Sequence, residues 1–331
     1  WHSSGITTSV VGALKRGLAP LAGELGIHVC GGRGRHSRRT PDELARLGER
    51  TGLDAVALTR ASRLVAKVDS AAVQDGFDLY LHGFFVTDDG RWTVVQQGMN
   101  GGLRQARRSH WHSADVADFV DAPHSAIDGP GQGEIVNLAD RRAGPARSAQ
   151  LALLADLGPG RVADDYAAMI GAPVAQPLLS HLVMPAHHDV RSGDVFVRRL
   201  HATLAAAADR GPIDFPDLLL SPGVGARTVR SLAMVAEVVH GTPFRFEDPA
   251  RFSLAHGGKD RHPYPVPTAV YDETIRVLKS AVGQAKLGRD EALGAIRRLD
   301  AGARALEGRF GRPAFAGLVS GEGAASPAPR G

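Results

Sequence analysis

Alternation of apolar and polar residues is clearest between residues 77 and 97, where it predicts a β-hairpin. The pair Asp89-Gly90 separates the two halves and is a preferred two-residue turn. With this turn, His82 faces Gln97 across the hairpin, on the face opposite the core. We expect the core face to carry Phe77, Leu79, Leu81, Phe85, Trp92 and Val94.

Helical spacing of apolar residues predicts helices over much of the remaining chain. One helix should run from Thr40 to about Thr51, with Thr40 as the N-cap and Glu43 completing a capping box. Another should follow Gly98 and extend to His112. The pattern therefore predicts an α+β protein.

The chain of 331 residues is long enough for two domains with separate cores. We expect an α+β domain at residues 1–128, a linker at 129–146 and an all-helical domain at 147–312. Residues 313–331 are rich in Gly, Ala, Ser and Pro, which predicts a disordered tail. The chain begins at Trp1, within what resembles the middle of a motif, so we expect a truncated N-terminus.

Composition indicates a basic protein of the cytoplasm. The formal net charge is +4, and most of the 39 basic residues are arginines, which suit bidentate contacts with phosphate. The single Cys30 excludes an internal disulfide and a zinc site built on cysteines. No apolar run approaches the roughly 20 residues that a membrane helix needs. Nucleic acid is therefore the first partner to consider.

Residues 217–233 predict two short helices joined by the tight turn Pro222-Gly223-Val224-Gly225. Gly223 and Gly225 let the chain reverse sharply and approach a ligand closely. The first amides of the second helix favour an anion, to which Arg227 and Arg230 add charge. The segment resembles the helix-hairpin-helix motif of DNA-repair and recombination proteins, which binds a backbone phosphate without reading sequence. The alternative is an ordinary αα-hairpin that serves only packing.

Polar side chains gather between residues 62 and 97. Lys67, Asp69, Asp75 and His82 are the candidate catalytic residues, because such groups suit acid–base or metal-assisted cleavage of phosphodiesters. A nuclease that works by metal-assisted cleavage would need a divalent metal. The alternative is a polar sheet face covered by salt bridges.

Further basic residues extend the expected nucleic-acid surface. Arg107 and Arg108 are interleaved with aromatic residues on the helix expected after Gly98. Lys259 lies in a polar stretch, 256–264, that we expect beside the turn of residues 222–225. In both cases the alternative is a structural role: a solvated basic helix face in the first and a scaffold loop in the second.

Six segments carry a resemblance to a known family: residues 1–8, 62–69, 74–76, 94–100, 222–225 and 252–260. Together they resemble an uncharacterised prokaryotic family, domain of unknown function seven-six-three. The resemblance extends to about residue 285 and implies no established activity. Family members usually carry a further N-terminal segment, which agrees with the expected truncation.

Asp248 adds a second, partial resemblance. Helix-hairpin-helix DNA glycosylases place a catalytic aspartate one helix after the hairpin, and Asp248 stands in about that place. Arg227 occupies the position at which bifunctional members carry a lysine, and arginine cannot form a Schiff base. The resemblance therefore implies at most a monofunctional glycosylase.

Together these features predict a cytoplasmic, DNA-associated protein of repair or recombination that binds the nucleic-acid backbone through residues 217–233. Three alternatives stay open. The first is a metal-dependent nuclease that uses the residues of the 62–97 cluster. The others are a monofunctional DNA glycosylase and a non-catalytic adaptor whose hairpin packs against a protein.

Overall fold

The computed structural model describes residues 4–103, 105–129, 131–171 and 197–250, with two isolated positions at 276 and 280. Beyond its first two residues, the chain divides into two compact units. The first comprises residues 3–19 and 27–255, and the second comprises residues 20–26 and 256–331. The second unit contains the short helix α2 (Ala22–Leu25), and the elements that follow belong to the first.

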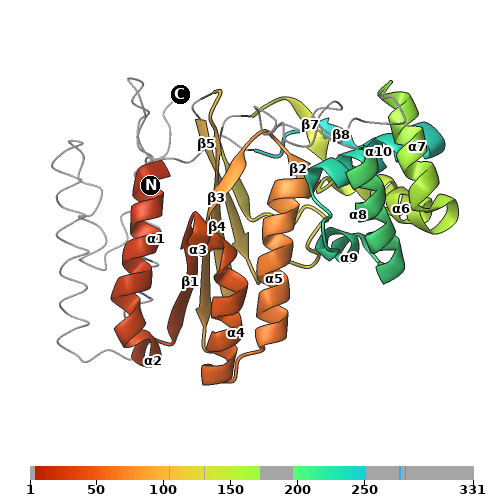
Figure 1. Cartoon of the computed structure of the whole chain (residues 1–331). Coiled ribbons are helices and arrows are strands. Elements are labelled where there is room, and N and C mark those ends of the chain that lie inside the picture. The colour runs from red at the N-terminus through yellow and green to blue at the C-terminus, as the bar shows by residue number, and fades with distance from the viewer. Residues whose placement is uncertain are drawn as a thin grey trace, which may run out of the picture. The chain divides into compact units, whose positions relative to one another are not determined.

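A five-stranded antiparallel sheet forms the centre of the first unit (Figure 1). Its strand order is β1-β3-β4-β5-β6. The strands are β1 (Ile27–Arg33), β3 (Asp78–Thr87), β4 (Trp92–Asn100), β5 (Gln105–His112) and β6 (Ala126–Asp128). The predicted hairpin is therefore confirmed as β3 and β4, at the middle of the sheet.

Helices cover both faces of this sheet. α1 (Ser4–Leu18) covers one face, where Val11 lies against Gly83 of β3. The other face carries α3 (Arg35–Arg38), α4 (Thr40–Thr51) and α5 (Ala55–Lys67), and α5 continues into a π-helical turn, Val68–Ala72. On that side, apolar residues of α4, α5, β3 and β4 share one core: Leu44, Leu47, Leu58, Val65, Phe84 and Val94.

A second, three-stranded sheet joins segments that are far apart in the sequence. Its strands are β2 (Val73–Gln74), β7 (Glu134–Asn137) and β8 (Arg245–Glu247). The other α-helices in the described part of this unit are α6 (Gly144–Ala152), which continues into a π-helical turn at Leu153–Leu157, α7 (Gly158–Met169), α8 (Val197–Arg210), α9 (Phe215–Leu220) and α10 (Ala226–His240). Buried residues of the small sheet and of these helices belong to the same core as α4 and α5.

The expected linker, 129–146, contains β7, which pairs with β2 on one side and with β8 on the other. Residues 27–128 and the described residues of 147–250 belong to one compact unit, and their buried apolar side chains share one hydrophobic core. The described part of the expected helical domain includes β8 and is therefore not all-helical. The fold is mixed α+β, as predicted, and the expected tail at 313–331 lies outside the described residues.

The helix expected between Gly98 and His112 is wrong, because residues 105–112 form strand β5, which pairs with β4 along its whole length. Arg107, Ser109 and Trp111 are buried and alternate with more exposed neighbours. Two of these three buried positions are polar, which hides the period-two alternation of a strand from a pattern based on hydropathy.

The register of the β3–β4 hairpin differs from the prediction by one residue. The loop contains three residues, 88–90, in which Gly90 has a left-handed φ of 81°. Three-residue loops with such a glycine are a common hairpin connection. His82 therefore faces Gln96 rather than Gln97.

The expectation of a single core face is also wrong, because helices cover both sides of the sheet. Phe84 and Val95, which are not among the residues of the predicted core face, are both buried. Alternation alone cannot distinguish a half-buried strand from one that is covered on both faces.

Helix α4 has the predicted bounds, but Thr40 and Glu43 in its first turn do not form the predicted capping box. The Thr40 hydroxyl donates to the carbonyl oxygen of Ser37 at 2.8 Å. The Glu43 carboxylate accepts the amide of Gly31 at 2.7 Å and the ammonium of Lys15 at 2.6 Å. Glu43 thus ties α4 to β1 and α1 instead of closing a capping box.

Gly31 tests the pairing of β1 with β3. Its φ is 85°, and a Cβ at this position would lie 2.1 Å from the carbonyl oxygen of His82. Alanine must push the two strands apart, so we expect Gly31→Ala to lower the free energy of unfolding by about 3 kcal/mol or more. At Gly12 of α1 a Cβ would meet nothing within 4 Å, so Gly12→Ala should raise it by up to about 1 kcal/mol. Urea unfolding measures both, and equal values would contradict the observed register.

Candidate active site

A pocket of about 500 Å³ lies between α5, the β3–β4 hairpin and the turn that precedes α10. One face of α5 supplies much of its wall, and Arg38 comes from the end of α3. The lining includes Arg38, Ser62, Arg63, Lys67, His82, Gln96 and the turn residues Leu220–Gly223. The volume is in the range of small-molecule sites.

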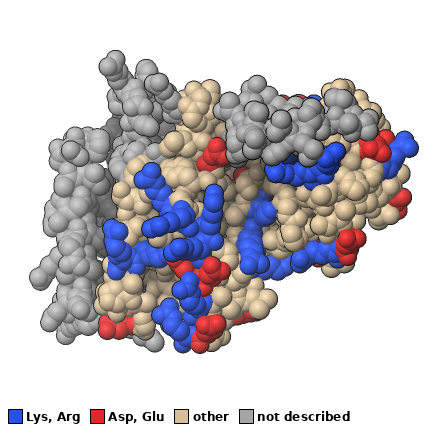
Figure 2. All heavy atoms as spheres, in the orientation of Figure 1, with Lys and Arg blue, Asp and Glu red and all other residues tan. Residues whose placement is uncertain are grey.

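The wall of the pocket carries positive charge. Arg38 and Arg63 form no ion pair with another described residue, so their guanidinium groups are available to an anion. Lys67 donates to the carbonyl oxygen of Val224 in the turn before α10, and burial lowers the pKa of Lys67. Figure 2 shows lysine and arginine side chains gathered on the face of the molecule that carries α3, α4 and α5. This charge favours an anionic ligand.

Ser62 and His82 meet at the wall of the pocket. The hydroxyl oxygen of Ser62 lies 3.0 Å from Nε2 of His82, and Nδ1 of His82 lies 2.7 Å from Oε1 of Gln96. The amide nitrogen of Gln96 donates to the carbonyl oxygen of Val65 at 3.1 Å and to the carboxylate of Asp69. We call Ser62, His82, Gln96 and Asp69 the buried relay.

Asp69 ends the buried relay, in the π-helical turn that follows α5. Its carboxylate also accepts the indole N–H of Trp111 at 3.1 Å and a hydrogen bond from Nε2 of His124. Asp69 is only 6% exposed, so these donors replace the water that its carboxylate has lost. π-Helical turns are frequent at functional sites.

Burial lowers the pKa of His82, while the hydrogen bond to Gln96 and the charge of Asp69 act in the opposite direction. The residue is 5% exposed. Its imidazole is therefore neutral at neutral pH and can accept a proton.

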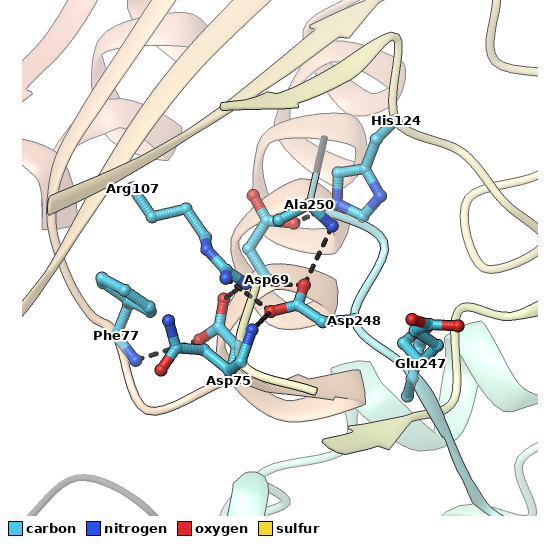
Figure 3. A network of polar contacts seen from close by, with 10 residues as sticks. Asp69, Asp75, Phe77, Arg107, His124, Glu247, Asp248 and Ala250 are labelled. Atoms are coloured by element: carbon cyan, nitrogen blue, oxygen red, sulfur yellow. Dashed lines mark hydrogen bonds and ion pairs between the residues drawn. The ribbon is translucent and has the colours of Figure 1, made fainter. Parts of the chain in front are cut away.

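A second buried network surrounds Arg107 of β5 (Figure 3). Its guanidinium donates to both carboxylate oxygens of Asp248, at 3.0 and 2.5 Å, and to Asp75 at 2.7 Å. It also lies 4.6 Å from the centre of the Phe77 ring. The three charged side chains are at most 9% exposed. The network joins β5 of the large sheet to segments beside β2 and β8 of the small sheet.

The structure divides the four residues of the 62–97 cluster that we expected to act together. Lys67 and His82 line the pocket, and Asp69 is linked to His82 through Gln96. Asp75 belongs to the Arg107 network instead.

The carboxylate of Asp248 is fully engaged within the fold. Besides Arg107, it accepts the backbone amides of Gln132 at 2.7 Å and of Ala250 at 2.9 Å. A carboxylate held in this way has no free oxygen with which to activate water, so the contacts favour a structural role over the expected catalytic one.

The two arginines of β5 are not placed to bind nucleic acid. Arg107 is 3% exposed, and Arg108 pairs with Asp128 at 2.6 Å and donates to Thr7 at 3.1 Å. Their expected role depended on a helix that presents them to solvent, whereas the strand directs Arg107 into the protein. Lys259 lies outside the described residues.

The turn between α9 and α10 contributes to the pocket wall. Gly223 has a left-handed φ of 79°, whereas Gly225 is extended and directly precedes α10. Arg227 and Arg230 lie near the start of α10, and both are half-buried. Val224 and one face of α10 are buried, and this buried stripe comprises Val224, Thr228, Val229, Leu232, Ala233 and Val235.

Sequence reasoning missed several residues that line the pocket or contact Asp69. Ser62 shares a helix face with Ala66 and Ser70, a spacing of four that could have marked it. The predicted register is one residue off, so it places Gln97 rather than Gln96 opposite His82. Trp111 and His124 gave no local signal, because they reach Asp69 across 42 and 55 residues of sequence.

Within the described ranges, no group of three or more His, Cys, Asp or Glu side chains could hold a metal ion. None of the described helices is both long enough and apolar enough to cross a membrane.

A family described as "Protein of unknown function (DUF763)" matches residues 1–266. The chain belongs to this family. The match includes the six segments that carry the resemblance, and it spans both the buried relay and the α9–α10 turn of this DUF763 member. No curated protein and no solved structure matches the chain.

Asp75 should make stability depend on pH. Burial raises the pKa of Asp75 to about 6 from its ordinary 3.8, against the opposing charge of Arg107. Between about pH 4 and pH 6 this carboxyl therefore binds more protons in the folded protein than in the unfolded chain, so its contribution to the free energy of unfolding falls as the pH rises. Asp75→Asn removes this slope. Relative to that variant, we expect the unaltered protein to lose up to roughly 3 kcal/mol across the interval.

Urea titrations at several pH values measure this difference. Asp164→Asn, at an exposed position of α7, is the control and should leave the slope unchanged. Parallel profiles for the unaltered protein and Asp75→Asn would contradict the assignment.

Proposed function

We propose that this protein is a cytoplasmic, DNA-associated protein of repair or recombination that binds the nucleic-acid backbone through a helix-hairpin-helix made by α9 and α10. One observation carries the proposal. The α9–α10 turn forms a wall of the pocket to which Arg38 and Arg63 also contribute. A phosphate bound at the turn would therefore meet backbone amides and guanidinium groups together.

The local geometry of the turn supports anion binding. The first amides of α10 have no partner within the helix, as at any helix N-terminus, and the 15-residue helix adds its dipole. Gly225 brings no side chain over these amides, and Arg227 follows within the first turn. The bond from Lys67 to Val224 holds the turn against α5, where Arg63 lies.

The same features are suited to recognising the phosphates of a nucleic-acid backbone rather than a particular base sequence. Guanidinium groups and amides recognise phosphate, which every nucleotide carries, and such contacts position nucleic acid without specifying its sequence. A pocket of about 500 Å³ is large enough to admit a phosphate together with its sugar.

The earlier alternatives receive less support. The carboxylates expected to serve a metal-dependent nuclease do not converge in the described part of the chain, and Asp248, expected to serve a glycosylase, is held by Arg107. An adaptor would bind DNA weakly and with little dependence on salt, so a binding experiment separates it from the proposal.

Neutralising either pocket arginine should weaken DNA binding. We expect Arg63→Gln and Arg38→Gln each to lower affinity about fivefold to tenfold at low salt. Each should also reduce the slope of log affinity against log salt by about one, because one phosphate contact is lost. Anisotropy titrations with labelled single-stranded, duplex and branched oligonucleotides measure both quantities. Arg161→Gln is the charge-matched control, since Arg161 lies on α7, 69% exposed and outside the pocket.

Gly225→Val tests the turn itself. Gly225 is extended, with φ −152°, and a Cβ there would meet nothing within 4 Å, so the fold should tolerate valine. Its branched side chain would cover the first amides of α10, and we expect affinity to fall about tenfold. Gly223 is less suitable, because its φ of 79° strains any side chain. Wild-type affinity in folded Gly225→Val and Arg63→Gln proteins would contradict the proposal.

A further inference from the structure

The buried relay has the arrangement of a nucleophile and its general base. Ser62 Oγ and His82 Nε2, at 3.0 Å, are within reach of proton transfer. Both residues contribute to the pocket wall, beside the cations Arg63 and Lys67. The hydroxyl group therefore lies where an anionic ligand would bind.

Gln96 selects the tautomer of His82 that this chemistry needs. Because its amide nitrogen donates to Val65 and Asp69, its oxygen is the atom that faces Nδ1 of His82. That oxygen can only accept, so Nδ1 carries the proton and Nε2 keeps its lone pair. The Ser62 hydroxyl then donates to Nε2, as a nucleophile does to its base.

Asp69 stabilises the charge that would develop on His82. A proton taken from Ser62 turns the imidazole into a cation, and the buried carboxylate of Asp69 favours that cation through Gln96. Trp111 and His124 hold the carboxylate in place.

We propose that the pocket is the active site of a phosphodiesterase in which Ser62 is the nucleophile and His82 is the general base. The choice of substrate rests on the proposed function, because the arginines that would hold a backbone phosphate line the same pocket as Ser62.

In the first step, the Ser62 oxygen attacks phosphorus and its proton passes to Nε2 of His82. The bond from phosphorus to the leaving oxygen breaks, and that oxygen takes a proton from the ammonium of Lys67. In the second step, water attacks phosphorus and gives a proton to Lys67. The bond from phosphorus to Ser62 breaks, and His82 returns the proton to the Ser62 oxygen. One diester and one water become one monoester and one alcohol, and all three side chains are restored.

Lys67 suits the role of the acid, because in-line displacement places the leaving oxygen on the far side of phosphorus from the nucleophile. It follows Ser62 by five residues on the pocket face of α5, or about 7.5 Å along the helix axis. A proton donor separate from His82 is thus available on the same wall. The lowered pKa of Lys67 makes its ammonium a stronger acid.

The test uses the full chain with two probes, bis(p-nitrophenyl) phosphate and a labelled single-stranded oligonucleotide. We expect both to be hydrolysed equally with Mg²⁺ and with a chelator, since the steps use only side chains and water. Ser62→Ala should lower kcat about a thousandfold or more and leave DNA affinity within about twofold. Acid-quenched reactions of the unaltered protein should carry a phosphoryl adduct on the peptide that contains Ser62, detected by mass spectrometry.

Two further variants sharpen the test. Ser231→Ala is the matched control, because Ser231 is a buried helical serine whose hydroxyl donates to the carbonyl oxygen of Arg227 at 2.9 Å, so kcat should not change. Lys67→Met should slow cleavage of the oligonucleotide far more than that of the nitrophenyl ester, whose leaving group needs no acid.

Turnover that survives Ser62→Ala, or an adduct on another residue, would overturn the assignment. DNA binding without hydrolysis by the unaltered protein would also overturn it and would leave the proposed DNA-binding role intact. Hydrolysis of the nitrophenyl ester without DNA affinity would support the active site and contradict the proposed partner.

Discussion

The buried carboxylate of Asp69 constrains the centre of this fold, because a carboxylate removed from water must be fully hydrogen-bonded. Its donors come from Gln96 on β4, Trp111 on β5 and His124 in the segment before β6. Because Asp69 lies just after the end of α5, these bonds fix the position of the C-terminal end of α5 relative to the sheet. The π-helical turn Val68–Ala72 provides that ending. The same bonds orient Gln96, and Gln96 in turn orients His82 toward Ser62.

The position of the α9–α10 turn follows from the same part of the chain. Lys67 and Gln74, on either side of the π-helical turn, donate to the carbonyl oxygens of Val224 and Ala226. Nearby, Arg107 pairs with the two buried carboxylates of Asp75 and Asp248 and joins the large sheet to the small one. The hydrogen bonds of Asp69 thus orient the polar side chains of the pocket, and the Arg107 network connects the two sheets.

Local patterns predict what is local in this fold, and long-range contacts decide the rest. The bounds of α4, the β3–β4 hairpin and the buried stripe of α10 follow from spacing within a few residues. Hydropathy predicts a helix at strand β5, because the buried face of this strand contains Arg107, whose charge is compensated by the distant Asp75 and Asp248. His82 was recognised as a candidate, but its partners required the register of β4 and the packing of α5, which no short segment encodes.

The protonation state of His82 tests this account most directly. Long-range ¹⁵N–¹H correlation spectra of histidine-labelled protein, with the His82 signals assigned by their absence in His82→Asn, report each ring nitrogen separately. At pH 7 we expect a protonated Nδ1 and an Nε2 without a proton, as the amide orientation of Gln96 requires. A proton on Nε2, or an imidazolium at that pH, would contradict the account, because Nε2 could then not accept the proton of Ser62.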